Sequence, residues 1–348
     1  VMNSTIMWKE IFEQADAIPN VIQQNRRTVA ALAEKVKEAG VSQIVFVARG
    51  TSDHAATFGK YLLEISTGIP VGLSAASVCT IYESQLRYQG ALVIGVSQSG
   101  AGVDVCEVLK SAKKGGAITA AITNDESSII AKAADYHLHC ACGEEISVAA
   151  TKTFISQLLL VTMLAAALSG KPELEAVLLD IEKASRYALS LSQQVEQLAL
   201  RYRFMSECFV LSRGLGYPIA LETGLKIQET CYVKAKAYSV ADFKHGPFAM
   251  VDSNTPVYLI GVDKRVNGDI SATLDRLNEV GADSLVVTND KSVYEKATVG
   301  ILLPEWCDGI TGCFAAAAIA QMFASTLSLL KGNNPDAPRG LKKVTITR

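Results

Sequence analysis

This sequence has almost no net charge. It carries 33 Lys and Arg residues against 35 Asp and Glu residues, a formal net charge of -2. A nucleic-acid-binding domain carries a basic excess on one face, and a segment that binds anionic lipid carries a polybasic cluster. The sequence shows neither feature, so we expect neither a nucleic-acid partner nor a membrane partner.

Closely spaced metal or redox ligands are also scarce. Among the eight cysteines only Cys140 and Cys142 are near one another, and this spacing is not that of a zinc knuckle. The other cysteines stand mostly in apolar runs, which is typical of buried free thiols in a reducing compartment. No Gly-x-Gly-x-x-Gly motif follows a strand-like run. We therefore expect no metal and no redox cofactor.

No apolar run meets the length and purity of a membrane span. The run 158–168 is too short, and the run 314–330 contains Gln321 and several small polar residues. Both runs predict buried core helices. No signal-peptide pattern precedes the first charged residues, Lys9 and Glu10. We expect a cytoplasmic protein.

The chain does contain an internal repeat. Its 348 residues, 49% of them hydrophobic, suffice for two domains with sizeable cores. Three apolar segments recur in the same order at shifts of 164 to 166 positions: 44–50 as 208–214, 91–96 as 257–262, and 122–125 as 287–290. Each copy alternates a short β-branched run, a glycine turn and a helical stretch, a pattern that indicates right-handed βαβ units and a parallel sheet.

The repeat predicts an α/β fold with two tandem doubly wound parallel-sheet domains, each a flavodoxin-like or Rossmann-like three-layer sandwich. The expected division is a helical arm at 1–29, a first domain at 30–172, a connecting helix at 173–194, a second domain at 195–332 and a non-helical tail at 333–348. In such sheets ligands bind beyond the carboxyl ends of the strands.

Two loops of the first copy are suited to a phosphate. The first has Gly50, Thr51 and Ser52 ahead of a helix expected to open near Ala55. The second has Ser97, Gln98 and Ser99, again leading into a helix. Hydroxyls beside the free amides of a helix N-terminus can bind an anion, although plain N-capping would explain either loop alone. The corresponding loops of the second copy lack the hydroxyls, which favours a ligand role in the first copy.

The segment 143–152 is a weaker candidate. It precedes a long apolar helix, and the backbone amides of Ala150 and Thr151 are positioned to face the same ligand. A simple helix cap is the alternative interpretation.

Acid–base groups gather in the second copy. Lys226 and Glu229 are three residues apart on a predicted helix and so share one face. The spacing alone is equally typical of an ordinary surface ion pair. His245 lies between Lys244 and a Gly-Pro pair, which predicts a loop position, and its side chain titrates nearest neutrality. In the tail, Lys343 is placed either to form a Schiff base with a sugar carbonyl or simply to be solvated.

Taken together, these motifs resemble the sugar-isomerase (SIS) superfamily. More specifically, the chain resembles the isomerase half of glucosamine-6-phosphate synthase and the stand-alone SIS-type glucosamine-6-phosphate deaminases. The matching segments cover nearly the whole chain in family order: 50–52, 97–100, 145–152, 213–222, 226–229, 244–247 and 338–343.

The resemblance implies roles for individual residues. The loops of the first domain would hold the sugar phosphate through Thr51, Ser52, Ser97, Gln98 and Ser99, with Gly50, Val148 and Ala150 beside them. Glu229 would move a proton between C1 and C2, and Lys226 would assist it. His245 would open the sugar ring from a neighbouring subunit, which implies a homodimer. Lys343 would form the Schiff base.

The sequence also departs from the synthase pattern. Where the synthase continues Ser-Gly-Glu-Thr, this chain has Gly100, Ala101, Gly102 and Val103, and Ala150 replaces a further hydroxyl residue. About 30 residues precede the first repeat, too few for a glutaminase domain, so we do not expect glutamine to be the nitrogen donor.

The leading functional expectation is a deaminase that converts an amino-sugar 6-phosphate, such as glucosamine 6-phosphate, into a keto-sugar 6-phosphate and ammonia. The alternatives are a deglycase acting on a fructose-amino acid 6-phosphate, a plain aldose–ketose phosphosugar isomerase, and a non-catalytic sugar-phosphate sensor.

Overall fold

The structure is a computed structural model that describes residues 4–343. The ends of the predicted arm and tail, residues 1–3 and 344–348, lie outside the described residues. The chain divides into two compact units. The N-terminal unit comprises residues 13–146, 150–179 and 341–343, and the C-terminal unit comprises residues 4–12, 147–149 and 180–340.

The N-terminal unit is built on a five-stranded parallel sheet in the order β2-β1-β3-β4-β5. Its strands are β1 (Gln43–Val47), β2 (Val71–Leu73), β3 (Ala91–Val96), β4 (Ile118–Thr123) and β5 (Tyr136–His139). All six residues of β3 are buried. A central strand covered on both faces has no polar side to present, which explains why its sequence shows no alternation.

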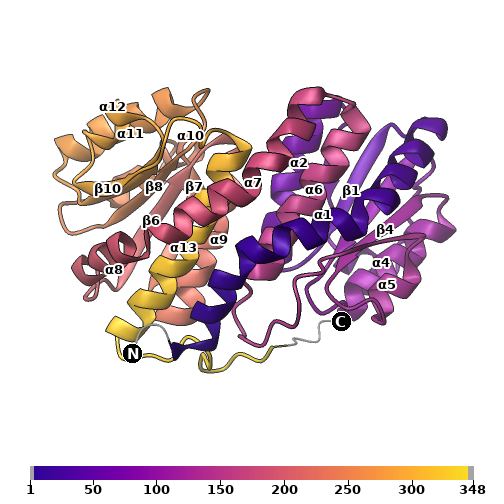
Figure 1. Ribbon diagram of the computed structural model, residues 1–348, viewed down its shortest axis with the longest axis horizontal. Coiled ribbons are helices and arrows are strands. Elements are labelled where there is room, and N and C mark those ends of the chain that lie inside the picture. Colours follow the sequence, from indigo (N-terminus) through magenta and orange to yellow (C-terminus); the bar gives the residue numbers. More distant parts are fainter. Residues whose placement is uncertain (1–3, 344–348) are drawn as a thin grey trace. The chain divides into compact units, whose positions relative to one another are not determined.

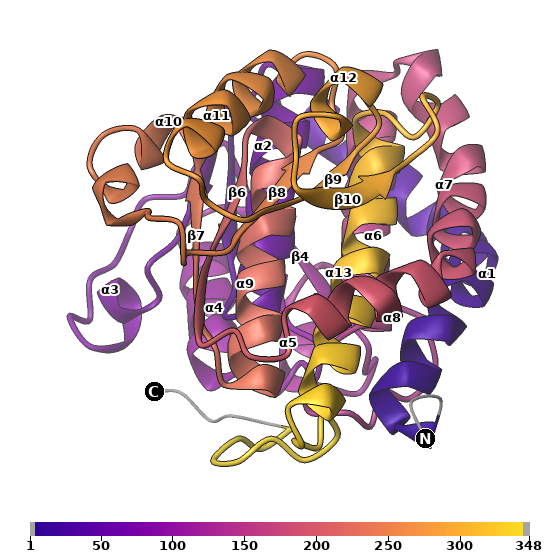
Figure 2. The same ribbon diagram turned by 90° about the vertical axis from the view of Figure 1, so that its left-hand side faces the viewer.

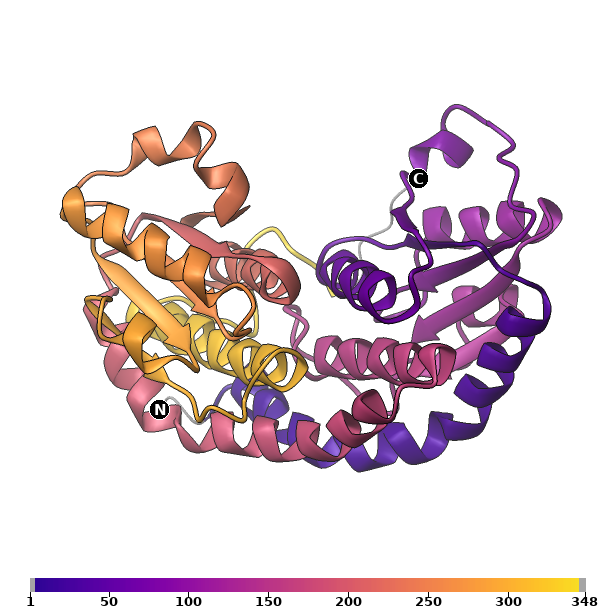
Figure 3. The same ribbon diagram turned by 90° about the horizontal axis from the view of Figure 1, so that it is seen from above.

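Helices cover both faces of this sheet. Helices α2 (Thr51–Thr67) and α6 (Lys152–Ser169) pack against one another, with α2 against β1, β2 and β3. Helices α4 (Val103–Lys114) and α5 (Ile129–Ala133) pack against β3, β4 and β5, and the short α3 (Ser77–Thr80) contacts α4. Figure 3 shows the sheet between its helical layers.

The C-terminal unit repeats this plan. Its strands are β6 (Glu207–Ser212), β7 (Lys234–Ser239), β8 (Val257–Gly261), β9 (Ser284–Thr288) and β10 (Val299–Leu302). Their order is β10-β9-β8-β6-β7, again all parallel. In both units the first strand of the unit therefore lies between its second and third strands. The prediction of two doubly wound parallel-sheet domains is confirmed, and Figure 1 shows the two sheets.

The helices of the C-terminal unit also form two layers. Helices α9 (Tyr217–Cys231) and α13 (Ile310–Leu330) lie side by side, and α8 (Ser192–Arg201) packs against α13. The remaining helices, α10 (Val240–Phe243), α11 (Asn267–Glu279) and α12 (Lys291–Tyr294), contact the sheet separately and appear along the top of Figure 2. Two 3-10 turns, η2 (Gly214–Gly216) and η3 (Pro247–Met250), complete the unit.

Three helix boundaries differ from the sequence-based expectation. The N-terminal helix α1 (Ile6–Glu38) continues beyond residue 29 and contains Pro19. The expected connecting helix is two helices, α7 (Pro172–Ser190) and α8, separated at Leu191. Helix α2 begins at Thr51, not near Ala55, because Gly50 adopts a φ of 54° that reverses the chain directly after β1.

Helices α6 and α13 are the two long apolar helices. By length and composition each is able to cross a membrane, but 89% of each apolar window is buried inside the structure. The expectation that neither run has the length and purity of a membrane span is therefore wrong, because each helix extends beyond the apolar run seen in the sequence. The expectation that both are buried core helices is confirmed by their burial.

Candidate active site

The loops that follow β1 and β3 in the N-terminal unit hold the predicted phosphate ligands. Thr51 and Ser52 are the first two residues of α2. Ser52 is 6% exposed, and its Oγ accepts a hydrogen bond from Nε2 of the buried Gln157 at 3.0 Å. The hydroxyl of Ser52 is therefore held by a neighbouring helix, α6.

The loop 97–100 is folded by its own hydroxyls. Ser97 Oγ accepts from the amide of Gly100 at 3.1 Å, and Ser99 Oγ accepts from the amide of Ala101 at 3.3 Å. Gly100 has a φ of 65°, and a Cβ at this position would lie 2.1 Å from Ser128 Oγ. Only glycine fits this turn, which presents the half-buried Ser99 at the carboxyl end of β3.

A cavity of about 730 Å³ opens beside this loop. Two predicted phosphate-site residues, Gln98 and Ser99, line it together with the predicted Schiff-base lysine, Lys343. Its other lining residues are Asn124, Asp125, Glu126, Ser127, His139, Gly143, Glu144 and Glu145. Gly50, Thr51, Ser52 and Ser97 are not among its described lining residues.

Glu145 is a buried carboxylate in the cavity wall that the sequence argument did not single out. Its side chain is fully buried and forms an ion pair with Lys343, Nζ to Oε2, at 3.2 Å. Its Oε1 accepts the amides of Thr151 and Thr153 at 2.9 and 3.1 Å, at the N-terminus of α6. Of the two interpretations of the segment 143–152, the helix cap is the one observed, because Glu145 occupies the Thr151 amide that a ligand would need.

The other two residues expected near the phosphate, Val148 and Ala150, are half-buried. They fall in different compact units, Val148 in the C-terminal unit and Ala150 in the N-terminal unit.

In the C-terminal unit, helix α9 carries the predicted acid–base pair. Lys226 is 1% exposed, and its Nζ lies 2.5 Å from Glu229 Oε2 and 3.3 Å from Glu222 Oε1. Positions 222, 226 and 229 share one helical face at spacings of four and three. Burial alone would lower the pKa of Lys226, but the two carboxylates, Glu222 foremost, outweigh it and raise that pKa above its ordinary value. Lys226 is therefore a permanent cation, and Glu229, 23% exposed, is the member of the cluster with appreciable exposed surface.

His245 stands apart from this cluster. It is exposed in the turn 244–246 between α10 and η3, and its amide donates to the Asp242 carbonyl at 3.0 Å. Within the described residues, Lys226 pairs with Glu222 and Glu229, and no hydrogen bond or ion pair connects His245 to this cluster. The loop position that the sequence predicts is observed.

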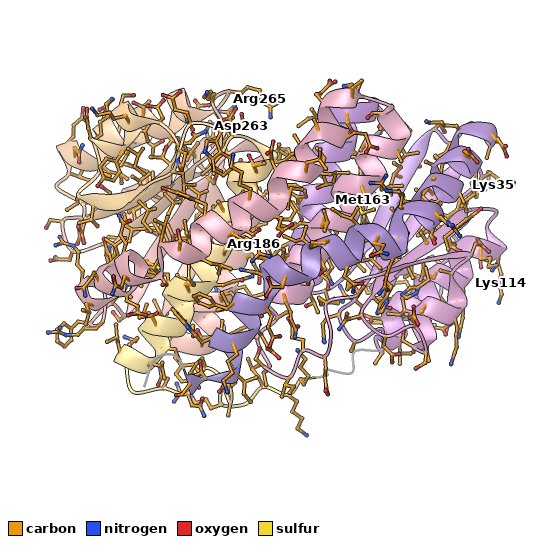
Figure 4. The ribbon with its side chains drawn as sticks, in the orientation of Figure 1. Lys35, Lys114, Met163, Arg186, Asp263 and Arg265 are labelled. Carbon is orange, nitrogen blue, oxygen red and sulfur yellow. The ribbon has the colours of Figure 1, made fainter. Side chains whose placement is uncertain are left out.

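The carboxyl ends of the strands in the C-terminal unit are occupied by their own side chains. Arg265 pairs with Asp263 at 2.7 Å, and Arg213 pairs with Asp269 at 2.8 Å. Figure 4 shows Asp263 and Arg265 together. Asp308 accepts hydrogen bonds from the Lys264 amide and from the side chain of Asn289. These charged and polar side chains pair with one another, whereas the corresponding loops of the N-terminal unit present hydroxyls. Across the described part of the chain, no three His, Cys, Asp or Glu side chains form a metal-binding group.

Comparison with known proteins places this geometry in a family. The SIS domain model matches residues 25–167 and 206–331. The glutamine–fructose-6-phosphate aminotransferase [isomerizing] of Thermococcus kodakarensis is 32% identical over 351 residues, which cover 98% of this chain and 58% of that protein. The chain thus spans less than two thirds of the length of this relative.

Solved structures agree. The C-terminal domain of glucosamine-fructose-6-phosphate aminotransferase from Francisella tularensis superposes with a TM-score of 0.85 at 25% identity, covering 96% of this chain and 98% of that one. Glucosamine-6-phosphate deaminase from Thermotoga maritima shares the fold, with a TM-score of 0.79 at 21% identity and coverage of 99% and 100%. The resemblance inferred from the motifs is confirmed, and the chain belongs to the SIS-domain family, with two SIS domains in tandem.

Proposed function

We propose that this protein is a phosphosugar isomerase that deaminates an amino-sugar 6-phosphate, giving a keto-sugar 6-phosphate and ammonia. The observation that carries the proposal is that the primary amine of Lys343 lines the same cavity as Ser99 and Gln98. An amine beside a phosphate-type loop suits a phosphorylated sugar whose carbonyl passes through an imine. The aminotransferase relatives are named for fructose 6-phosphate, a substrate of the same class.

In the proposed reaction the sugar ring first opens to an aldehyde at C1 with the amine at C2. The carboxylate of Glu229 removes the proton from C2 and returns it to C1. This step leaves an imine at C2. Lys226, held as a cation between Glu222 and Glu229, stabilises the negative charge that develops on the enol oxygen.

Ammonia leaves when the C2 imine is replaced. Lys343 passes its ammonium proton to the C2 imine nitrogen, and its amine then adds to C2 and expels ammonia, forming a protonated imine between C2 and Nζ. Water then hydrolyses this imine to the keto sugar and regenerates Lys343, so one water is consumed for each ammonia released. Ring opening is assigned to His245 of a second copy of the chain, so the proposed functional unit is a homodimer. His245 lies in an exposed turn, which suits a side chain that acts on a site in another copy of the chain.

The test is turnover of glucosamine 6-phosphate by the purified protein, with ammonia and fructose 6-phosphate both measured. We expect the two products in equal amounts, and loss of both in Glu229→Gln with sugar-phosphate binding retained. Glu295→Gln is the matched control, because Glu295 belongs to an exposed ion pair. The reverse direction, fructose 6-phosphate with ammonium, is assayed in parallel. Failure in both directions by a protein that binds fructose 6-phosphate would refute the deaminase.

The size of the cavity favours one second candidate, a deglycase for a fructose-amino acid 6-phosphate. At about 730 Å³ the cavity is large for a hexose phosphate, since pockets of roughly 300–1,000 Å³ hold larger, drug-sized ligands. Its wall carries Asp125, Glu126 and Glu144, which suit a cationic amino group. Release of a free amino acid from such a substrate, without ammonia from glucosamine 6-phosphate, would select this function.

A further inference from the structure

Helix α6 contains one long polar side chain in its buried, otherwise apolar middle. Gln157 is 0% exposed, and most of the residues that follow it to 168 are apolar. The short hydroxyls of this stretch are satisfied within the helix, Ser156 on the carbonyl of residue 152 and Thr162 on that of residue 158. A glutamine amide has more hydrogen-bonding groups than its own helix can satisfy, so it must find partners elsewhere.

Gln157 finds a single partner among the described residues. Its Nε2 donates to Ser52 Oγ at 3.0 Å, across the packed pair of helices α2 and α6. Its Oε1 is buried and has no hydrogen-bond partner in the described part of the chain. A leucine or methionine would pack here without leaving a buried oxygen unsatisfied. Packing therefore does not explain why a glutamine stands at this position.

The contact constrains the Ser52 hydroxyl. A serine oxygen has two lone pairs and one hydrogen, and the Gln157 amide occupies one lone pair. The hydroxyl hydrogen cannot point back at the N–H that donates to the same oxygen. The hydroxyl hydrogen is therefore left to donate to a different acceptor. Ser52 lies at the N-terminus of α2, a position that favours a bound anion.

We propose that Gln157 is a positioning residue for phosphate recognition, which it serves by fixing the orientation of the Ser52 hydroxyl. The inference rests on the proposed function, in which Ser52 is a phosphate ligand. Gln157 itself does not touch the substrate. Its hydrogen bond prearranges the donor, so the phosphate does not have to order that hydroxyl when it binds.

The test is a double-mutant cycle on ligand binding, using Gln157→Met, Ser52→Ala and the double variant. Binding of fructose 6-phosphate and of inorganic phosphate is measured by titration calorimetry. We expect Gln157→Met to weaken both ligands about fivefold to tenfold, the effect of one lost hydrogen bond. We expect no further loss when it is added to Ser52→Ala, because the two residues act through one hydrogen bond. The melting temperature should not fall, since methionine removes a buried amide oxygen that has no hydrogen-bond partner among the described residues.

Gln321→Met is the matched control. Gln321 is also a buried glutamine in a long apolar helix, α13 of the C-terminal unit, and it should leave phosphate affinity unchanged. If Gln157→Met does not fold, Gln157→Leu replaces it in the cycle.

Three results would overturn the inference. The first is wild-type affinity for both ligands in the Gln157 variant, and the second is an equal loss of affinity from the Gln157 substitution whether residue 52 is serine or alanine. The third is that the wild-type protein binds neither ligand. Binding is read without turnover. A protein that shows the coupling but releases no ammonia would therefore refute the proposed deaminase and leave the role of Gln157 supported.

Discussion

The ε-ammonium of Lys343 lies 3.2 Å from the carboxylate of Glu145, whose side chain has no exposed surface. The same carboxylate accepts the amides of Thr151 and Thr153 at the start of α6. One buried group thus both caps a core helix and holds the tail lysine at the cavity wall. A lysine on a non-helical segment loses much conformational freedom when it is held, and this ion pair supplies the compensating interaction.

Replacing Glu145 should therefore reduce imine formation by Lys343. We expect Glu145→Gln to lower the amount of borohydride-trapped adduct with fructose 6-phosphate about tenfold, since hydrogen bonds to charged groups contribute about 1.5–3 kcal/mol. Mass spectrometry of the trapped protein measures the adduct and locates it. Glu144→Gln is the control, because Glu144 lines the same cavity but is exposed. Equal trapping by the two variants would contradict the role of Glu145.

A second prediction concerns the stability of α9. Lys226→Met should lower the free energy of unfolding by about 3–5 kcal/mol, because it leaves the buried Glu222 and the nearby Glu229 facing one another without a cation. Lys291→Met removes an exposed ion pair at 3.7 Å in the same unit and should change stability by less than about 1 kcal/mol. Urea unfolding of both variants gives the comparison, and a similar small change in both would show that the cluster is not stabilising.

The sequence was sufficient for the fold because its repeat and its patterning agree. The apolar runs at 44–47 and 208–211 predict buried strands, and the structure places both inside their sheets, at the corresponding position of the strand order in each unit. Helix ends were less predictable. The start of α2 depends on the φ of Gly50, a backbone property that no periodicity reveals.

The supporting residues of the site could not be read from the sequence. Glu145 looks like one of two adjacent acidic residues in a loop, and only the fold shows that it is buried against Lys343, 198 residues away. Glu222 belongs to a matched motif and is four residues from Lys226. Its role as a buried partner of that lysine depends on its burial, which the sequence does not show. Gln157 contacts Ser52 across 105 residues. Such contacts depend on how helices pack, which a local pattern does not contain.

A third prediction follows from His137. Burial, and next the charge of the neighbouring His139, lower the pKa of His137 below its ordinary value of 6.5. Below that pH the unfolded chain binds a proton that the folded chain does not, so the free energy of unfolding falls as pH falls through 6.5 toward the lower folded-state pKa. We expect His137→Gln, which no longer titrates, to lose less stability than the wild type between about pH 7.5 and about pH 5.5, one unit either side of the ordinary value. Parallel stability curves for the two proteins would exclude His137 as a source of acid sensitivity.

The last prediction concerns the thiols. Of the eight free cysteines seven are buried, and only Cys79, in the short helix α3, is partly exposed. Burial raises the pKa of Cys142 and of Cys208 to about 12, which keeps them as thiols rather than reactive thiolates. We expect a thiol reagent such as DTNB to label Cys79 at least about tenfold faster than any other cysteine, since Cys79 alone among the eight has partly exposed surface. Cys79→Ser should remove the fast phase, and unfolding in guanidinium should expose the remaining thiols together. A fast phase that persists in Cys79→Ser would mean that a cysteine described as buried reaches solvent through local opening of the fold.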